Sequence, residues 1–419
     1  MVVRPSESVT NGVAFADKMI ELSSFDKPLV GIETKVLLVF EHPINDPVET
    51  IRRSLSRALV DYYPLAARLA VDSNDYIDCG NLDGVTFAAA SANCSIREFI
   101  TTVDNNPPEA STAMLRELAV NYSAKGGCGR ADPLLTLQVT VFTCGGFVVG
   151  VAWDHGAADG FGMAQFLLAV GELARGLPTP SVVPLRQSPT KLVVPPFTSA
   201  VQRFIGGMPS CDVGMVNVTI PSTFINRIKS TGSDVAFTTF EIVTAVLWQC
   251  RTRTVMTDPA APAVLLFSAN GRKQLGLDDA YYGNCTTLQM AMESSGQVAS
   301  ADISDVVRMI RRAKEQISDQ DRSGELLRTI SELGDRRVGY ESVVFVTCWR
   351  NIGFEDVDFG GGKTARVTTF SQNLLRPFCV ICLPCKWEKG AKVLSGCVAA
   401  QHSDAFLKEI STLTNNLTD

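Results

Sequence analysis

Apolar and polar residues alternate along positions 135–141. This period of two residues predicts a strand with one buried face. A turn at Cys144-Gly145-Gly146 follows, and the run 147–153 is almost wholly apolar, as in a strand that is covered on both faces. Residues 163–175 contain no proline and a single glycine, which predicts a helix that begins near Asp159. The patterns together predict a strand, a turn, a second strand and a helix in immediate succession.

Other segments of the chain have helical signals. Asp46 offers a capping oxygen, Pro47 fits the first turn of a helix, and Glu49 stands three residues after the cap. Apolar residues then recur on one face of the predicted helix. Helical spacing also appears in 240–251 and in 306–317. Mixed helices and strands without a solenoid repeat predict an α/β protein.

Proline is dense between positions 176 and 197, and the apolar periodicity is lost there. A chain of 419 residues is long for one core, and two domains of roughly 200 residues each are the usual solution. We therefore place the crossover between two domains in this stretch. The predicted division is an N-terminal domain at 1–180, a linker at 181–205 and a C-terminal domain at 206–419.

The composition is that of an ordinary globular protein. Apolar residues make up 46% of the chain, charged residues 20%, and the net charge of -6 gives no reason to expect a nucleic-acid partner. No run approaches the roughly 18 apolar residues of a membrane span. Residues 1–12 have no apolar core of the kind found in signal peptides. We expect a cytoplasmic protein without a membrane partner, and we expect it to be a monomer.

The chain has twelve cysteines, scattered and mostly inside apolar runs, which favours reduced, buried thiols. Cys379 and Cys382 have the spacing of a zinc-ligand pair, and Cys385 follows. A zinc site needs a second pair or histidines, and only His402 lies downstream. Residues 378–383 also resemble a strand. We therefore expect structural cysteines and no metal site.

Residues 360–364, Gly-Gly-Gly-Lys-Thr, end like a phosphate-binding loop. That loop needs a glycine six residues before its lysine, and Val357 stands at that position. We expect the glycines to permit a tight turn instead.

His155 stands between the second predicted strand and the predicted helix. The unperturbed pKa of histidine, roughly 6.5, lets a side chain held there act as a base near neutral pH. Asp159 lies at the helix start, so we expect it to cap the helix or pair with a buried arginine, and not to act as a second acid. Gly156 and Gly160 leave space for a close approach of backbone or ligand. This motif alone leaves one alternative open, namely that His155 is a buried core residue whose ring nitrogens are hydrogen-bonded and which takes no part in catalysis.

The residues also carry a family resemblance. His155-Gly-Ala-Ala-Asp159-Gly160, with Asp358-Phe-Gly360-Gly361-Gly about two hundred residues later, resembles the motif pair of the plant BAHD acyl-CoA-dependent acyltransferases. Further blocks that are similar to family segments occur in the family's order: Ser23–Asp26, Tyr63–Arg68, Phe240–Trp248, Asn270–Arg272, Tyr282–Asn284 and Thr347–Trp349. The resemblance covers essentially the whole chain.

The resemblance implies a two-domain fold of the chloramphenicol-acetyltransferase type, with mixed sheets, flanking helices and an active site at the domain interface. It implies that His155 deprotonates a hydroxyl or amine acceptor, which then attacks the thioester of acyl-CoA. Because a thioester is already activated, the reaction needs no permanently bound cofactor, metal or covalent enzyme intermediate. The expected partners are therefore acyl-CoA and a small-molecule alcohol or amine.

The resemblance also assigns the remaining site residues. Asp159, grouped with His155 in the catalytic motif, is expected to turn away from the channel and pair with Arg272. Asp358 is expected to shape its loop on the CoA side, and Gly160 to support the site. The expected CoA-binding residues are Thr347, Trp349, Gly360 and Gly361.

Two positions depart from the family pattern. Gly361 replaces the usual tryptophan of the second motif. The side of the site that would border the acyl-CoA therefore lacks an indole, and which acyl group it prefers stays open. Asp154 stands where relatives often have a histidine, and we expect it to be a surface or turn residue that faces away from His155.

Several functions remain open at this point. We rank O-acylation of a plant secondary metabolite first and N-acylation of an amine to a phenolamide second. A non-catalytic CoA-binding paralogue is a third candidate, motivated by the missing tryptophan, although the intact His155 and Asp159 argue against it. A condensation domain of peptide synthesis, which uses a similar histidine motif, is more remote because the chain has no room for a carrier domain.

Overall fold

A computed structural model describes residues 1–6, 18–122, 128–186, 192–208, 213–231, 236–315, 323–335, 339–370, 377–384 and 389–415. The chain forms two compact units. The first unit is Met1–Val193 with Gly271–Thr286 and Arg350–Gln372, and the second is Val194–Asn270 with Thr287–Trp349 and Asn373–Asp419.

The two units are interleaved in sequence. The chain first passes from one unit to the other after Val193, which lies inside the range predicted for the linker. The boundaries 1–180 and 206–419 differ from the observed units because 271–286 and 350–372 return to the first unit. Apolar periodicity cannot reveal such a return, because it reports local structure and not tertiary partners.

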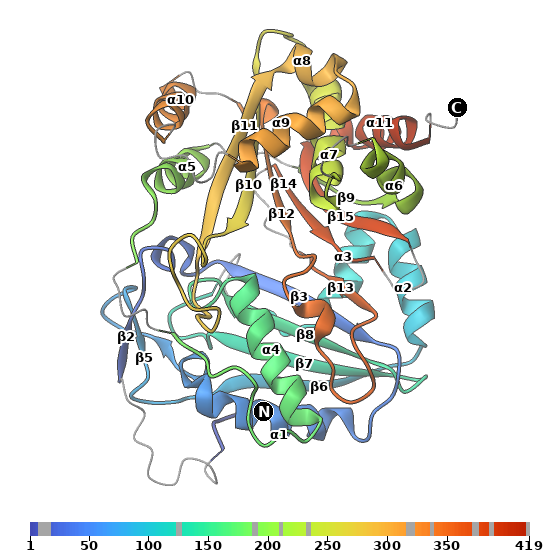
Figure 1. The fold of residues 1–419 in the computed structure, drawn as a ribbon. Coiled ribbons are helices and arrows are strands. Elements are labelled where there is room, and N and C mark those ends of the chain that lie inside the picture. The colour runs from blue at the N-terminus through green and yellow to red at the C-terminus, as the bar shows by residue number, and fades with distance from the viewer. Residues whose placement is uncertain are drawn as a thin grey trace. The chain divides into compact units, whose positions relative to one another are not determined.

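The first unit is built on a six-stranded sheet of order β1-β6-β7-β8-β3-β13 and a three-stranded sheet of order β2-β5-β4 (Figure 1). Its strands are β1 (Val2–Val3), β2 (Met19–Glu21), β3 (Glu33–Phe40), β4 (Arg68–Leu69), β5 (Tyr76–Asp78), β6 (Val85–Ala92), β7 (Leu135–Phe142), β8 (Phe147–Asp154) and β13 (Arg366–Thr368). Its helices are η1 (Lys27–Leu29), α1 (Pro47–Asp61), η2 (Tyr63–Ala66), α2 (Ile96–Asn105), α3 (Pro108–Arg116), α4 (Gly160–Ala174) and η5 (Phe354–Asp356).

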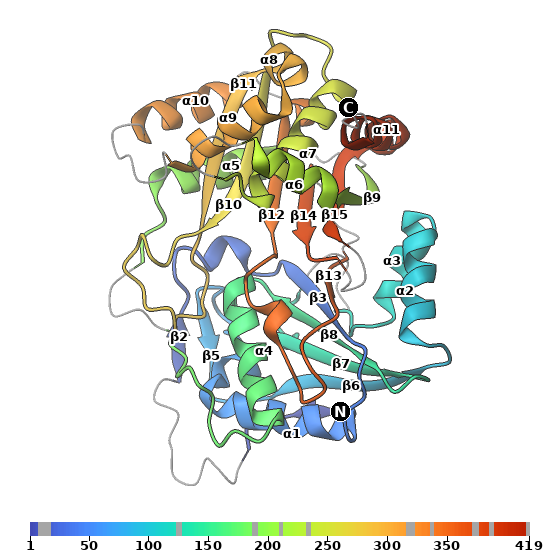
Figure 2. The same ribbon diagram turned by 45° about the vertical axis from the view of Figure 1, so that its right-hand side comes forward.

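The predicted strand, turn, strand and helix are confirmed as β7, β8 and α4 (Figure 2). β8 lies between β7 and β3, antiparallel to both, and all of its residues are buried. α1 begins after Asp46 as predicted, with the Asp46 carboxylate accepting from the Glu49 N–H, and it packs against α4. The end of this central, fully paired strand is therefore a rigid support for the residues that follow it.

β13 is an edge strand supplied by the second half of the chain. It pairs antiparallel with β3, and the Ala365 N–H donates to the Val39 carbonyl at 2.7 Å. Arg366, on β13, makes a bidentate ion pair with Asp104 at 2.9 Å. These contacts attach the 358–364 loop, which directly precedes β13, to the first unit.

The second unit contains a six-stranded sheet of order β11-β10-β12-β14-β15-β9. Its strands are β9 (Val213–Pro221), β10 (Pro262–Asn270), β11 (Thr286–Ser294), β12 (Val343–Cys348), β14 (Phe378–Cys382) and β15 (Gly390–Ala399). Its helices are α5 (Pro196–Gly207), α6 (Ser222–Ser230), α7 (Thr239–Val255), α8 (Ser295–Ser300), α9 (Ile303–Glu315), α10 (Ser323–Asp335), η4 (Tyr340–Ser342), η6 (Ala400–His402) and α11 (Ser403–Asn415).

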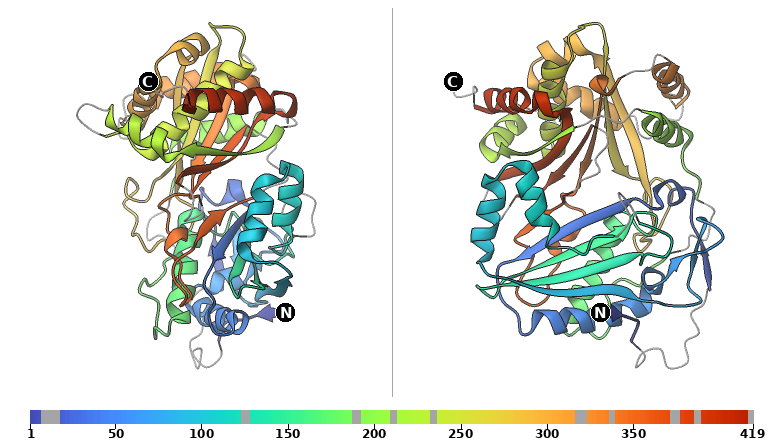
Figure 3. Two further views of the ribbon diagram at one scale, coloured as in Figure 1. Left: turned by 90° about the vertical axis from the view of Figure 1, so that its right-hand side faces the viewer. Right: turned by 180° about the vertical axis from the view of Figure 1, so that it is seen from behind.

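Helices cover both faces of this second sheet. Leu265 and Phe267 of β10 belong to a core that includes residues of α7, α9 and α11. Val264 and Leu266, which point the other way, belong to a core shared with α5 and α10. Figure 3 shows α5 and α10 on the side of the sheet opposite α11. The two-domain α/β fold with mixed sheets and flanking helices is thus confirmed.

The two cysteines of β14 lie in the packed interior of the second unit. Cys379 and Cys382 are buried on the strand, and Cys379 contacts the Ser395 hydroxyl across the β14–β15 pair. Cys385 lies outside the described residues. In the described part of the chain, no three His, Cys, Asp or Glu side chains are grouped as metal ligands would be. No helix among the described residues has the length and apolar character needed to cross a membrane.

Candidate active site

His155 follows the last residue of β8 and begins a tight turn. Its backbone N–H donates to the Ile32 carbonyl at 2.8 Å, which ties it to the segment before β3. The N–H groups of Gly156 and Gly31 donate to the Asp154 carboxylate at 2.8 and 2.9 Å. The imidazole remains half-buried while its backbone is fixed on both sides.

Asp154 was expected to be a surface or turn residue, but it is the buried last residue of β8, directly before the turn. Only 1% of the residue is exposed, because the segment around Gly31 covers it. Burial raises the pKa of the Asp154 carboxyl above its usual value, although its hydrogen bonds from Gly156 and Gly31 act in the opposite direction. Its role in this structure is to hold the turn that carries His155.

The His155 ring contacts Asn284, which comes from a distant part of the sequence. The Nδ1 atom of His155 lies 3.1 Å from Oδ1 of Asn284. The Nδ2 atom of Asn284 donates to the His155 carbonyl at 2.7 Å and to Asp26 Oδ1 at 2.8 Å. Because Nδ2 of Asn284 donates to two oxygen atoms, the amide is oriented with Oδ1 toward the imidazole. Oδ1 can only accept a hydrogen bond, so Nδ1 of His155 carries the hydrogen and Nε2 keeps a lone pair.

A glycine in the first turn of α4 allows Asn284 to reach this position. A Cβ atom placed on Gly162 would lie 1.8 Å from the Tyr282 carbonyl oxygen. Such a separation is far inside van der Waals contact, so the backbone at Tyr282 rests directly on α4 only because residue 162 has no side chain. Asn284 follows two residues later.

Asp159 caps α4 and pairs with Arg272, as predicted. The Arg272 guanidinium donates to both carboxylate oxygens at 2.8 and 2.9 Å, and the N–H groups of Gly162 and Cys285 donate at 2.9 and 3.0 Å. Burial alone would lower the pKa of Arg272, but the charge and hydrogen bonds of Asp159 raise it overall. Because these donors occupy both oxygens, Asp159 supports the site and is not placed to take a substrate proton.

Arg272 also holds the segment that leads to Asn284. Its Nε donates to the Tyr281 carbonyl and its guanidinium to the Gly283 carbonyl, each at 2.8 Å. Asp159, at the start of α4, and Asn284 are thus connected through one buried guanidinium.

The 358–362 loop is the tight turn that the glycines predicted. The Asp358 carboxylate accepts from the N–H groups of Gly360 and Gly362 at 2.7 and 3.0 Å, and its carbonyl accepts from Arg175. Gly360 and Gly362 have φ angles of +114° and +102°, a region that disfavours residues with a side chain. The contacts of Asp358 are therefore those of a residue that shapes its loop.

Gly361 is enclosed on the side where a side chain would start. A Cβ atom there would lie 3.0 Å from both the His42 carbonyl oxygen and the Ile44 Cγ2 atom. A tryptophan at this position would require the 42–44 segment to move, which gives a local reason for the departure from the family motif.

Thr347 and Trp349 belong to the second unit, at and just after the end of β12. The Thr347 hydroxyl lies 2.7 Å from the Ser268 hydroxyl. The backbone N–H of Trp349 donates to the Ile381 carbonyl at 2.8 Å. Both side chains are half-buried. The other residues of the predicted site lie in the first unit.

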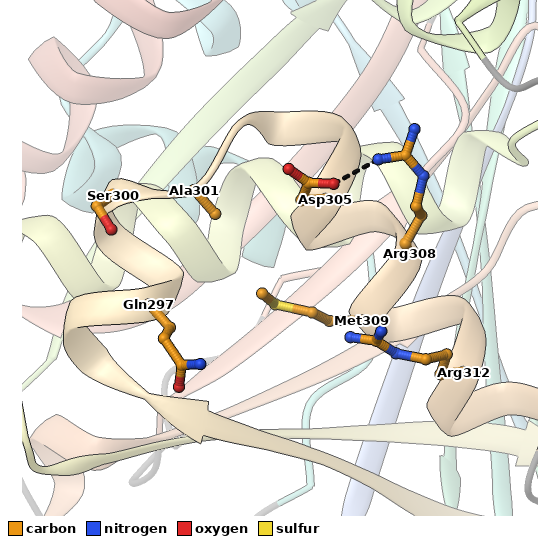
Figure 4. A pocket seen from close by; sticks show the side chains of 7 residues that line it. All are labelled: Gln297, Ser300, Ala301, Asp305, Arg308, Met309 and Arg312. Carbon is orange, nitrogen blue, oxygen red and sulfur yellow. Dashed lines mark hydrogen bonds and ion pairs between the residues drawn. The ribbon is translucent and has the colours of Figure 1, made fainter.

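The second unit also has an open pocket of about 400 Å³ on α8 and α9 (Figure 4). Its described lining is Gln297, Ser300, Ala301, Asp305, Arg308, Met309 and Arg312. None of the predicted site residues belongs to this lining, and Asp305 and Arg308 pair with each other. This pocket is separate from the contacts of His155.

Three residues around His155 had no role assigned from sequence. Asn284 and Asp26 fall inside segments that resemble family blocks, and that resemblance was the only signal for them. Arg186, which pairs with Asp26 at 3.1 Å, lies in the proline-rich stretch where periodicity gives no information. The polar environment of the imidazole is visible only in three dimensions.

Comparisons with known proteins agree with this architecture. A family described as the Transferase family matches residues 1–395. Acyl transferase 15 of Oryza sativa subsp. japonica is 52% identical, over 99% of this chain and 97% of that protein. Taxadien-5-alpha-ol O-acetyltransferase of Taxus chinensis is 31% identical, over 84% of this chain and 82% of that protein.

Solved structures show the same fold. The crystal structure of vinorine synthase matches with a TM-score of 0.77 at 21% identity, over 99% of this chain and 97% of that one. F. graminearum TRI101 complexed with coenzyme A and deoxynivalenol matches with a TM-score of 0.67 at 16% identity, over 92% and 96% of the two chains. At these identities the likeness establishes the fold alone.

Proposed function

The chain belongs to the BAHD acyltransferase family, and on that premise we propose that it transfers an acyl group from CoA to a hydroxyl group of a plant secondary metabolite, with His155 as the general base. The observation that carries this proposal is the contact between His155 Nδ1 and Asn284 Oδ1 at 3.1 Å. A ring that donates from Nδ1 has its basic lone pair on Nε2.

The chemistry follows from that tautomer. Nε2 takes the proton of the acceptor hydroxyl as its oxygen attacks the thioester carbonyl, and a tetrahedral oxyanion forms. The oxyanion collapses, the carbon–sulfur bond breaks, and the CoA thiolate takes the proton back from Nε2. While the ring is charged, Asn284 Oδ1 still accepts from Nδ1 and stabilises the imidazolium. A positioned base of this kind contributes about 10²- to 10⁴-fold to the rate.

Acyl-CoA is the proposed donor. TRI101, which shares this fold, has been solved in complex with coenzyme A. We assign the donor side to the residues of the two family blocks, namely Thr347, Trp349, Gly360 and Gly361. Hydrogen bonds to Asp358 fix the 358–362 loop, and Thr347 and Trp349 are each partly exposed within their own unit.

An alcohol acceptor is supported by a curated relative whose name describes an O-acetyltransferase. N-acylation of an amine uses the same base and the same tetrahedral path, so it stays as the alternative. A chain that binds CoA without turnover is the remaining alternative.

The test is thiol release from acetyl-, malonyl-, benzoyl- and coumaroyl-CoA with pooled plant alcohols and, separately, pooled amines. His155→Ala and the matched control His402→Ala are measured alongside. We expect release that depends on an alcohol, persists in the His402 variant and disappears in the His155 variant. Release only with amines would select N-acylation, and CoA binding without release would select the non-catalytic paralogue.

A further inference from the structure

Asp26 is a fully buried carboxylate beside the site that the proposed mechanism does not use. It ends the Ser23-Ser24-Phe25-Asp26 turn, just before η1. The Ser23 N–H and hydroxyl donate to its Oδ2 at 2.8 and 2.7 Å. A charged group with no exposure requires partners that offset its lost hydration, and the turn supplies only some of them.

The remaining partners come from Asn284 and Arg186. The backbone N–H and the side-chain Nδ2 of Asn284 donate to Asp26 Oδ1 at 3.0 and 2.8 Å. Arg186, itself buried, pairs with Oδ2 at 3.1 Å and donates to the Gly156 carbonyl at 3.3 Å. Both oxygens of Asp26 are therefore surrounded by donors.

This arrangement removes an ambiguity in Asn284. An amide side chain has nearly the same shape after a 180° flip, which would turn its nitrogen toward His155 Nδ1. The flipped amide would turn its oxygen toward the Asp26 carboxylate and the His155 carbonyl, and both of these groups only accept hydrogen bonds. One orientation is left, in which Oδ1 faces the imidazole.

We propose that Asp26 is a positioning residue for acyl transfer: it fixes the amide of Asn284 and thereby holds His155 as the tautomer whose Nε2 is free to act as base. The proposal rests on the function proposed for His155. Asp26 does not contact the ring itself and acts only through Asn284.

Arg186 completes the arrangement by balancing the charge of Asp26. Burial would lower the pKa of Arg186, but the Asp26 charge raises it, so the guanidinium stays protonated. Its place is fixed by a backbone bridge in which the Tyr282 N–H donates to the Leu185 carbonyl at 3.0 Å. The Arg186 guanidinium thus compensates the charge of the buried carboxylate near the imidazole.

The test is Asp26→Asn, observed by ¹⁵N NMR of histidine side chains. The chain has only three histidines, so the His155 signals can be assigned by their loss in His155→Ala. In the wild type we expect neutral His155 to carry its hydrogen on Nδ1. In Asp26→Asn, Arg186 and the Ser23 donors favour the amide oxygen on their own side, so the new NH₂ group faces Asn284 and removes the acceptor that fixes its amide. We expect a substantial Nε2–H population and a kcat lower by roughly 10- to 100-fold, with a smaller change in KM.

Two further variants keep the result interpretable. Asp104→Asn breaks the ion pair with Arg366 in the same unit and is expected to lower stability without changing the tautomer. Ser23→Ala removes one hydrogen bond to Asp26 without removing its charge, and it is expected to raise the Nε2–H population slightly. It replaces Asp26→Asn if that variant does not fold.

An Nε2–H tautomer in the wild type would overturn the proposal, as would an unchanged tautomer in both Asp26→Asn and Ser23→Ala, whatever happens to kcat. These readouts need no turnover. Failure of the proposed function would instead appear as full activity in His155→Ala.

Discussion

Removing the charge of Arg272 is the perturbation whose magnitude follows most directly from the structure. Asp159 and Arg272 are 1% and 4% exposed, and the pair is bidentate at 2.8 and 2.9 Å. Breaking a buried pair by removing one partner leaves an uncompensated charge and costs about 3–5 kcal/mol. In Arg272→Met, Asp159 keeps its hydrogen bonds from Gly162 and Cys285, which favours the lower end of that range.

Arg272→Met also removes the two hydrogen bonds to the carbonyls of Tyr281 and Gly283, each worth about 1 kcal/mol. We therefore expect the first unit to lose roughly 5 kcal/mol of stability. Activity should fall as well, because those carbonyls lie in the segment that carries Asn284 to His155.

The assay is urea unfolding of Arg272→Met, Asp159→Asn and the double variant. Because the two residues contact each other, the double variant should lose less stability than the sum of the single variants by about 1–3 kcal/mol. Glu49→Gln, which breaks an exposed pair with Arg52 in the same unit, should leave the unfolding midpoint almost unchanged. Losses below about 1 kcal/mol in both single variants, or strict additivity, would refute the reasoning.

Three further predictions test other parts of the account. Gly162→Ala should lower the free energy of unfolding by about 1–3 kcal/mol and remove most of the activity, because the new Cβ atom would lie 1.8 Å from the Tyr282 carbonyl oxygen. Gly206→Ala in α5 is the control, since a Cβ atom there meets no atom within 4 Å and should change neither. Equal melting curves for the two variants would contradict this prediction. Gly361→Trp should lower the melting temperature and change the ratio of kcat/KM between acetyl- and coumaroyl-CoA; an unchanged ratio would place residue 361 away from the donor. Burial would raise the pKa of Glu241, but Arg311, Lys314 and the Thr238 N–H lower it to about 2. The ionised carboxylate therefore stabilises the folded state fully above pH 4.5, and this contribution is lost as the pH falls toward 2. Glu241→Gln should therefore be less stable than the wild type at pH 7 by about 2 kcal/mol, and a gap that does not narrow between pH 5 and pH 3 would contradict the assignment.

Features that depend on neighbouring residues were predictable from the sequence. The strands β7 and β8, the start of α4 at Asp159 and the start of α1 at Asp46 follow from alternation and capping, which are local signals. The pairing of Asp159 with Arg272 was available only through the family resemblance, because their sequence separation gives no physical reason to connect them.

Features that depend on distant contacts were not predictable. Asp26 and Asn284 are 258 positions apart, and nothing in either segment indicates that one orients the other. Asp154 was expected to be a surface or turn residue because strand alternation points it away from His155, yet it is buried and accepts a hydrogen bond from the distant Gly31 N–H. The return of 271–286 and 350–372 to the first unit is likewise a tertiary property.

The central claim is that His155 is the base for acyl transfer, and acceptor-dependent CoA release by His155→Gln tests it most directly. Glutamine keeps a polar side chain at this half-buried position but cannot take a proton in the reaction. We predict a fall in kcat of about 10²- to 10⁴-fold, with the melting temperature and the affinity for acyl-CoA unchanged. A folded His155→Gln protein that transfers the acyl group at the wild-type rate would contradict the account.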